Sequence, residues 1–395
     1  VEHLKAKHGY VVGDINWGGV LNLAIDVRGE EIFTDMITRP DEVKAYFRSI
    51  ANVIDKFVWY VQSLTGSSSI SVNRSARLFD HPVAIHSECS HTMISEQDYR
   101  DFILPIDIEW SKRHQPYGIH YCGKDPHRHA EEFAKIERLA FLDVGWGGDV
   151  AHLRKHLPNT FFNIRLNPVD IETKTKDELH EIIKERVVAA GKDLTLTGLC
   201  CVNMDDKVSD ERIRDIYNIA SELRIETDDA SDTFDFNLAD SQATIVHPIP
   251  PKDFCLNEYE DYAAELDERC KEFWNADEGI LVYRRMRVKE VFAADSRDME
   301  KSLQWQLGAL KESMKFKADI ANFLEPWHGL GTVASAYGFD YIWEPGQAPA
   351  VNGKFASANE LVNAPYVPVA ETGIGKFTLD MTRYFVEQTE GRIPM

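Results

Sequence analysis

The chain has 395 residues, 44% of them hydrophobic, and a formal net charge of −21 from 44 basic and 65 acidic side chains. A surface this acidic repels phosphate backbones and anionic lipid headgroups, which argues against a nucleic-acid or membrane role. The length fits either two ordinary domains or one large α/β barrel with additions, and the apolar content suffices for a sizeable core.

The cysteines indicate a reducing compartment. There are six in the chain, at positions 89, 122, 200, 201, 255 and 270. Such thin use is typical of free or metal-bound thiols and not of a disulfide framework. The sequence contains no apolar run long enough to cross a membrane and no signal-peptide pattern at its start. We therefore expect a cytoplasmic protein.

Residues 1–224 alternate short apolar runs with helical patterns. The runs that we predict as strands lie at 10–14, 83–91, 117–122, 140–148, 161–168 and 194–201. The predicted helices lie at 41–64, from Ser95 onwards, and at 128–138, 149–157, 175–190 and 209–223. Helical spacing of apolar residues or an N-cap pattern marks their positions. Strands alternating with helices of this length predict parallel βαβ units.

Residues 225–279 break this alternation. They are rich in Asp and Thr, then in Pro, and we interpret them as a linker or extension with a helix at 259–275. In 280–395 we predict helices at 302–316 and 377–390, and strands at 319–331 and 341–345. The segments 1–224 and 280–395 are therefore expected to form two parts of one (β/α)₈ TIM barrel. A doubly wound open sheet is the rival, but no glycine-rich dinucleotide fingerprint follows any strand.

Two soft metal ligands end the strand predicted at 117–122. His120 and Cys122 are two residues apart, so their side chains point to the same face of a strand. An imidazole beside a thiolate is a pair that zinc selects, and one more sulfur is needed. Cys200 and Cys201 offer it at the end of a later strand, and we prefer Cys201 because it lies nearer that end. The alternative is a set of buried strand residues without a metal.

Further polar residues follow the predicted strands, at the barrel face where chemistry is placed. Glu88 is a catalytic candidate, either as a displaceable fourth ligand or as a base, against the alternative of a surface carboxylate or one paired with a nearby histidine. His86, Cys89 and His91 crowd the same strand end and are expected to be hydrogen-bonded bystanders. Asp14 is the second catalytic candidate. The expected substrate contacts are Asn16, Trp17, Asp143, Trp146, Arg165, Glu325 and His328, with Arg165 holding a carboxylate or sulfonate.

Several motifs resemble the uroporphyrinogen decarboxylase superfamily, including its zinc-dependent branch, which moves methyl groups between corrinoid proteins and thiols. The segments that carry the resemblance are 14–29, 118–123, 142–143, 165–168, 325–338 and 384–394. The resemblance implies a (β/α)₈ barrel with zinc on His120, Cys122 and one of Cys200 or Cys201. It also implies a corrinoid protein as partner and a small thiol or methylated donor as substrate. Barrels of this superfamily often pair, so a homodimer is expected.

The order of the segments differs from that of the family. The part that resembles the family's N-terminal third, about 280–395, comes last here. In a closed sheet the termini can fall between any two βα units, so we expect a circularly permuted barrel. The arginines that a decarboxylase needs have counterparts in Arg284, Arg285 and Arg287, but the surrounding pattern is missing. We therefore expect a zinc-dependent methyltransferase. The alternatives are a metal-free lyase acting on a carboxylated substrate and a non-catalytic barrel that binds a ligand.

Overall fold

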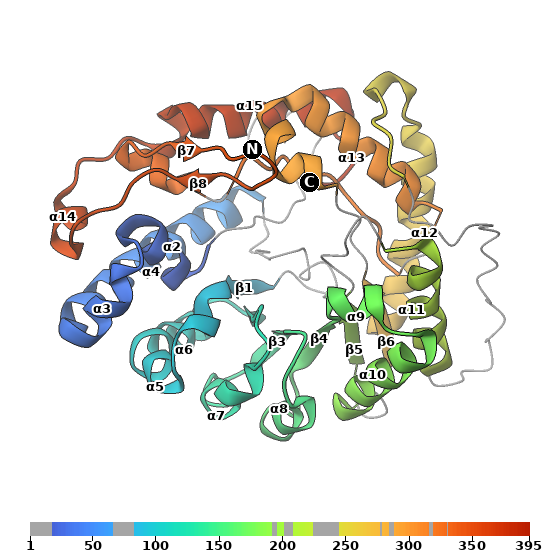
Figure 1. The fold of residues 1–395 in the computed structure, drawn as a ribbon, viewed down its shortest axis with the longest axis horizontal. Helices are drawn as coiled ribbons and strands as arrows, with labels where there is room; N and C mark the ends of the chain where they lie inside the picture. The colour runs from blue at the N-terminus through green and yellow to red at the C-terminus, as the bar shows by residue number, and fades with distance from the viewer. Residues whose placement is uncertain are drawn as a thin grey trace.

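Six parallel strands form the main sheet in the computed structural model of the chain (Figure 1). They are β1 (Ala84–Ser87), β2 (Tyr117–His120), β3 (Leu139–Val144), β4 (Phe161–Arg165), β5 (Leu196–Cys200) and β6 (Gly279–Tyr283). The structure describes residues 18–65, 83–191, 196–200, 208–223, 245–276, 279–283, 288–315, 319–329 and 331–395. Each strand pairs with the next one along the chain, which is the strand order of a βα barrel. The predicted α/β class with a parallel sheet is confirmed.

Helices connect the strands and lie outside the arc that the strands form in Figure 1. They are α5 (Glu96–Asp98), α6 (Leu104–Arg113), α7 (Ala130–Phe133), α8 (Val150–His156), α9 (Pro168–Thr173), α10 (Lys176–Ala189) and α11 (Asp210–Leu223). Two helix starts follow the sequence prediction in detail. Ser95 forms a capping box with Asp98, and Thr175 forms one with Glu178. Each box satisfies backbone N–H groups of the first turn, so these starts are encoded locally.

Three helices precede β1. They are α2 (Val20–Arg28), α3 (Glu31–Thr38) and α4 (Pro40–Thr65), and α4 confirms the helix predicted at 41–64. One face of α4 buries Val43, Phe47, Ile54 and Val58 against the core. These positions recur at the three- and four-residue spacing of a helix that packs on one side.

The last third of the chain carries α12 (Leu256–Trp274), α13 (Met299–Ser313), α14 (Ala358–Asn363) and α15 (Gly373–Gln388). The helices predicted at 259–275, 302–316 and 377–390 are confirmed, each starting a few residues earlier. In Figure 1, α13 and α15 lie across the ring of elements from α5 to α8. They share an apolar core that includes Leu303, Leu307, Met381 and Phe385.

Two strand predictions in this region are wrong, and one strand is unpredicted. Residues 341–345 do not add an eighth parallel strand, because β7 (Tyr341–Ile342) pairs antiparallel with β8 (Ala350–Val351) in a separate hairpin. Residues 319–329 run without strand pairing, although Asp319 accepts a 2.6 Å hydrogen bond from the amide of Val282 in β6. The strand β6 itself was not foreseen.

The predicted strand at 10–14 lies outside the described residues. Among those described, the strand pairing runs from β1 to β6 and does not return from β6 to β1. Within the same residues, every helix is too short or too polar to cross a bilayer.

Candidate metal centre

The carboxyl ends of β1 and β2 bring two cysteines together. The two strands are parallel neighbours, with Ser87 opposite His120. Two residues further along each chain segment stand Cys89 and Cys122, and Cys89 begins a short 3₁₀ turn that ends at Met93. The ligand atoms of Cys89, His120 and Cys122 all lie within 4.8 Å of one another, and His120 is buried. This is the group of described residues that could hold a metal ion.

The distances within the group fit a compact set of soft ligands. The Sγ atom of Cys122 lies 2.9 Å from Sγ of Cys89 and 2.5 Å from Nε2 of His120. Around a tetrahedral zinc ion, with Zn–S near 2.3 Å and Zn–N near 2.0 Å, such atoms stand about 3.5–3.8 Å apart. Each separation must therefore widen by about 1 Å for zinc to enter. The ligand types fit zinc. The ligand atoms lie closer together than they would around a zinc ion, because hydrogen bonds join Cys122 to Cys89 and to His120.

Asp143 holds the histidine in the orientation that a metal ligand needs. Its Oδ2 atom lies 2.5 Å from Nδ1 of His120, and Asn163 donates a 2.5 Å hydrogen bond to its Oδ1 atom. When the ring is neutral and Nδ1–H is donated to Asp143, the lone pair of Nε2 faces the two sulfurs, as metal binding requires. A carboxylate behind a metal-binding histidine is a common supporting contact, since it fixes the ring and its tautomer. Asp143 is buried, and the substrate contact predicted for it stays a prediction.

The group carries an internal ion pair when no metal is bound. The hydrogen bond from Cys89 and the charge of His120 lower the pKa of Cys122 to about 3, although burial opposes this. The same hydrogen bond, together with burial, raises the pKa of Cys89. Burial disfavours the charged ring of His120, but Cys122 and Asp143 outweigh it and raise the pKa of His120 to about 9. At neutral pH the sulfur of Cys122 is therefore a thiolate beside an imidazolium.

Arg165 and Trp146 flank this group from the ends of the next strands. The guanidinium of Arg165 lies 5.3 Å from the centre of the Trp146 ring, a cation–π contact. The charge of Arg165 is among the causes that lower the pKa of Cys122, after the hydrogen bond from Cys89 and the charge of His120. The loop of Trp146 packs closely on the loop after β2, since a Cβ on Gly145 would meet the carbonyl oxygen of Gly123 at 1.7 Å. A substrate role for Trp146 and Arg165 stays a prediction.

Glu88 is bound to the start of α2. Its carboxylate accepts hydrogen bonds from the backbone amides of Leu21 at 2.7 Å and Asn22 at 3.1 Å. It also accepts from the amide of Ser90 at 3.3 Å. These contacts satisfy first-turn N–H groups of the helix, and a negative charge is favourable there. Glu88 thus acts as a helix cap supplied by β1, and the ligand or base role predicted for it stays a prediction.

His86 belongs to a buried polar network next to Glu88. Nδ1 of His86 lies 2.6 Å from Asp107, whose carboxylate also accepts hydrogen bonds from Tyr99 at 2.5 Å and Tyr117 at 2.6 Å. Burial lowers the affinity of His86 for a proton, but Asp107 and Glu88 outweigh it and raise the pKa of His86 to about 9. His86 is a hydrogen-bonded structural residue, as expected.

The other bystander predictions have mixed outcomes. His91 is buried against Tyr121 and Tyr99, and neither of its ring nitrogens has a hydrogen-bond partner in the described part of the chain. Cys89 was expected to be a bystander, and the structure corrects this by placing it in the metal-ligand group. The signal available in the sequence was that Cys89 and Cys122 follow adjacent strands at matching positions.

Among the described residues the third member of the group is Cys89, and a ligand role for Cys200 or Cys201 stays a prediction. Cys200 is opposite Arg165 of β4 and therefore three strands away from β2. At about 4.8 Å per strand this is a backbone separation of about 14 Å along the sheet. The side chain of Cys200 and all of Cys201 lie outside the described residues, as do Asp14, Asn16 and Trp17 and the arginines at 284, 285 and 287.

Glu325 and His328 belong to the C-terminal part of the molecule. The backbone of Glu325 bonds to the side chain of Gln306 in α13. The Nδ1 atom of His328 donates to the carbonyl oxygen of Ser296 at 2.9 Å, and the ring centre lies 4.2 Å from that of Phe377 with the planes tilted by 38°. Neither residue is in the metal-ligand group, and the substrate contacts predicted for them stay predictions.

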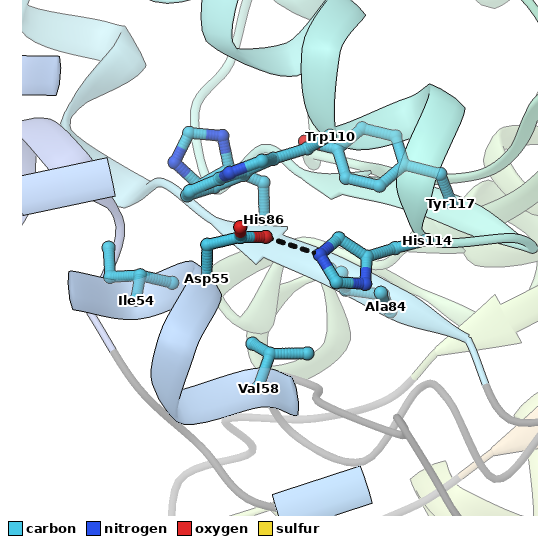
Figure 2. A pocket seen from close by; sticks show the side chains of 9 residues that line it. Ile54, Asp55, Val58, Ala84, His86, Trp110, His114 and Tyr117 are labelled. Atoms are coloured by element: carbon cyan, nitrogen blue, oxygen red, sulfur yellow. Dashed lines mark hydrogen bonds and ion pairs between the residues drawn. The ribbon is translucent and has the colours of Figure 1, made fainter. Parts of the chain in front are cut away.

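A further His–Asp pair lines a narrow cavity between α4, β1 and α6 (Figure 2). The Nε2 atom of His114 lies 2.7 Å from Asp55. The cavity offers about 10 Å³ to the centre of a water molecule, which is the lower limit for one water. It is too small for a substrate, so we regard the pair as structural.

Comparisons of the chain with family models, with curated proteins and with solved structures found no match. The assignment of a function therefore depends on the site itself. Its geometry offers two sulfurs and one oriented imidazole, and two of the three residues reach the protein surface in part. Three protein ligands with one open position are typical of catalytic zinc.

Proposed function

We propose that the protein is a zinc-dependent methyltransferase that moves a methyl group between a corrinoid protein and a small thiol or methylated donor. The observation that carries this proposal is the convergence of Cys89, His120 and Cys122, with Asp143 bonded to the histidine. Two thiolates and one imidazole favour zinc over harder cations. In this proposal the chain is a circularly permuted (β/α)₈ barrel of the uroporphyrinogen decarboxylase superfamily, in the cytoplasm and paired with a second copy.

Support for the barrel comes from the winding of the strands. Six consecutive strands pair in chain order, and the C-terminal elements lie across the ring from β1–β3 (Figure 1). An eight-stranded closed barrel needs two more strands, and the strand predicted at 10–14 is a candidate for one of them. In such a barrel the carboxyl ends of the strands form the reactive face, and the metal-ligand group lies at those ends of β1 and β2.

Zinc at this position would stabilise a substrate thiol as the thiolate, which is the nucleophile that takes the methyl group. The residues of the chain prepare the site for that substrate. Cys89 and Cys122 supply two negative charges, so the site is close to neutral and the incoming sulfur stays electron-rich. Asp143 keeps Nε2 of His120 directed at the centre. Arg165, stacked on Trp146, provides a positive charge for a carboxylate or sulfonate on the substrate.

Elemental analysis of protein purified without chelator tests the metal. We expect about one zinc per chain, lost in Cys89→Ser and in Cys122→Ser. The matched control is Cys255→Ser, because Cys255 is exposed at the start of α12, and this variant should keep its zinc. Retention of zinc in Cys89→Ser together with its loss in Cys201→Ser would show that the third ligand is the cysteine predicted from sequence.

Activity is tested by offering methylcobalamin as donor to a series of small thiols and following demethylation by absorbance. The zinc-bound protein should transfer the methyl group, and the two ligand variants should not. A metal-free protein with full activity, or a zinc-bound protein without any methyl transfer, would overturn the proposal.

A further inference from the structure

We propose that Cys89 and Cys122 also form an oxidation site, at which a hydroperoxide closes the pair into an intramolecular disulfide that excludes the metal. The inference rests on the proposed function, because it removes both sulfur ligands of the proposed zinc site. It assigns to the same residues a second chemistry, in which the protein is switched off by oxidant and restored by a thiol reductant.

The geometry of the pair is close to that of a disulfide. The two Sγ atoms are 2.9 Å apart, and a disulfide requires about 2.05 Å, so they must approach by less than about 1 Å. The cysteines follow neighbouring parallel strands at matching positions. Adjacent strands lie about 4.8 Å apart, within the Cα separations that disulfides span. The Sγ–Sγ distance of the pair is thus shorter than the distance between two sulfurs around zinc and longer than a disulfide bond.

The sulfurs are accessible, and their neighbours favour attack by Cys122. Both cysteines are partly exposed, whereas His120 beneath them is fully buried. The sulfur of Cys122 lies within hydrogen-bonding distance of both Sγ of Cys89 and Nε2 of His120, so a negative charge on this sulfur has two stabilising neighbours. An oxidant can therefore reach the two sulfurs from solvent.

The chemistry balances in two steps with a hydroperoxide as the oxidant. The sulfur of Cys122 attacks the terminal oxygen of the hydroperoxide, the O–O bond breaks, and the proton shared with His120 leaves on the alcohol product. The sulfur of Cys89 then attacks the resulting sulfenic acid, the S–O bond breaks, and the thiol proton of Cys89 leaves with water. Two thiols and one hydroperoxide give one disulfide, one alcohol and one water.

Two other cysteines provide an internal comparison. Cys255 is exposed at the start of α12, and Cys270 lies in the same helix. Fifteen residues of helix separate them by about 22 Å, so they cannot pair with each other. An oxidant that reacted by exposure alone would modify Cys255 first. A response at the partly exposed pair 89 and 122 is therefore diagnostic of the proposed site.

The experiment treats the full-length protein, metal-free and zinc-loaded, with limiting hydrogen peroxide. We expect the loss of two thiols and a peptide linked through Cys89 and Cys122, formed at least about tenfold faster than oxidation of Cys255 and reversed by dithiothreitol. Zinc-loaded protein should release its zinc in parallel. Cys89→Ser should form no linked peptide and should accumulate a sulfenic acid at Cys122 that dimedone traps. Cys255→Ser should behave as the wild type.

Preferential oxidation of Cys255, or a disulfide from Cys122 to Cys200 or Cys201, would overturn the inference. The two proposals fail in different ways. If no zinc binds but the linked peptide forms, the oxidation site stands and the proposed function falls. If zinc binds and methyl transfer occurs, but the metal-free protein gives no linked peptide, only the oxidation site falls.

Discussion

The hydrogen bond between Asp143 and His120 permits a quantitative test of the metal centre through Asp143→Asn. Both neighbours of the carboxylate are donors, namely Nδ1 of His120 and Nδ2 of Asn163. An asparagine has one acceptor oxygen, so its NH₂ group must face one of these donors. Loss of such a supporting carboxylate typically weakens metal binding 10- to 100-fold, about 1.4–2.7 kcal/mol.

The size of the loss should depend on pH. Burial opposes the charged ring of His120, but Cys122 and Asp143 raise its pKa to about 9, so below that value a proton competes with zinc. At about pH 7 this competition weakens zinc binding by the wild type. Asp143→Asn lowers the pKa of His120, so a proton competes less strongly with zinc in the variant. We therefore expect the wild type and the variant to differ little in zinc affinity near pH 7. Near pH 9 the variant should show the full loss of affinity, about 10- to 100-fold.

Zinc affinity is measured by competition with a chromophoric chelator at several pH values. The matched control is Asp55→Asn, which alters a similar carboxylate–histidine pair outside the metal centre (Figure 2). It should leave zinc affinity unchanged at every pH. Equal zinc affinity of the wild type and Asp143→Asn near pH 9 would refute the reasoning, since His120 would then not be a ligand oriented by Asp143.

Three further predictions concern stability. Thr175→Ala removes the capping box of α10 and should lower the free energy of unfolding by about 1 kcal/mol in urea titrations; an unchanged midpoint would contradict it. Burial and the charge of Glu88 raise the pKa of Asp26 to about 6, so the folded state loses stability as pH rises through 6. Asp26→Asn should therefore stabilise the protein by about 1–3 kcal/mol near pH 8 and hardly at all near pH 4, and equal gains at both would argue against this origin. Gly145→Ala brings a Cβ to 1.7 Å from the carbonyl oxygen of Gly123 and should lower both the melting temperature and the zinc content; wild-type values would show that the loop can move aside.

The sequence alone determined features whose causes are local. The capping boxes at Ser95 and Thr175 depend on residues three apart, and the structure has both. The alternation of apolar runs with helical patterns predicted parallel βαβ units, and the sheet is parallel in chain order. The pair His120 and Cys122 was also recognisable, because two residues on one strand always share a face.

Only the tertiary structure decided which residues complete the site. Cys89 stood 33 positions from Cys122, and its role depends on β1 lying beside β2 in a particular register. Asp143 became the support of His120 because β3 pairs with β2 at that position. The sequence also did not determine the short hairpin β7–β8 or the strand β6, because a run of two to five apolar residues does not specify which strand it pairs with. Periodicity and capping act within a few residues, whereas a metal site is made by strand neighbours that the packed sheet selects.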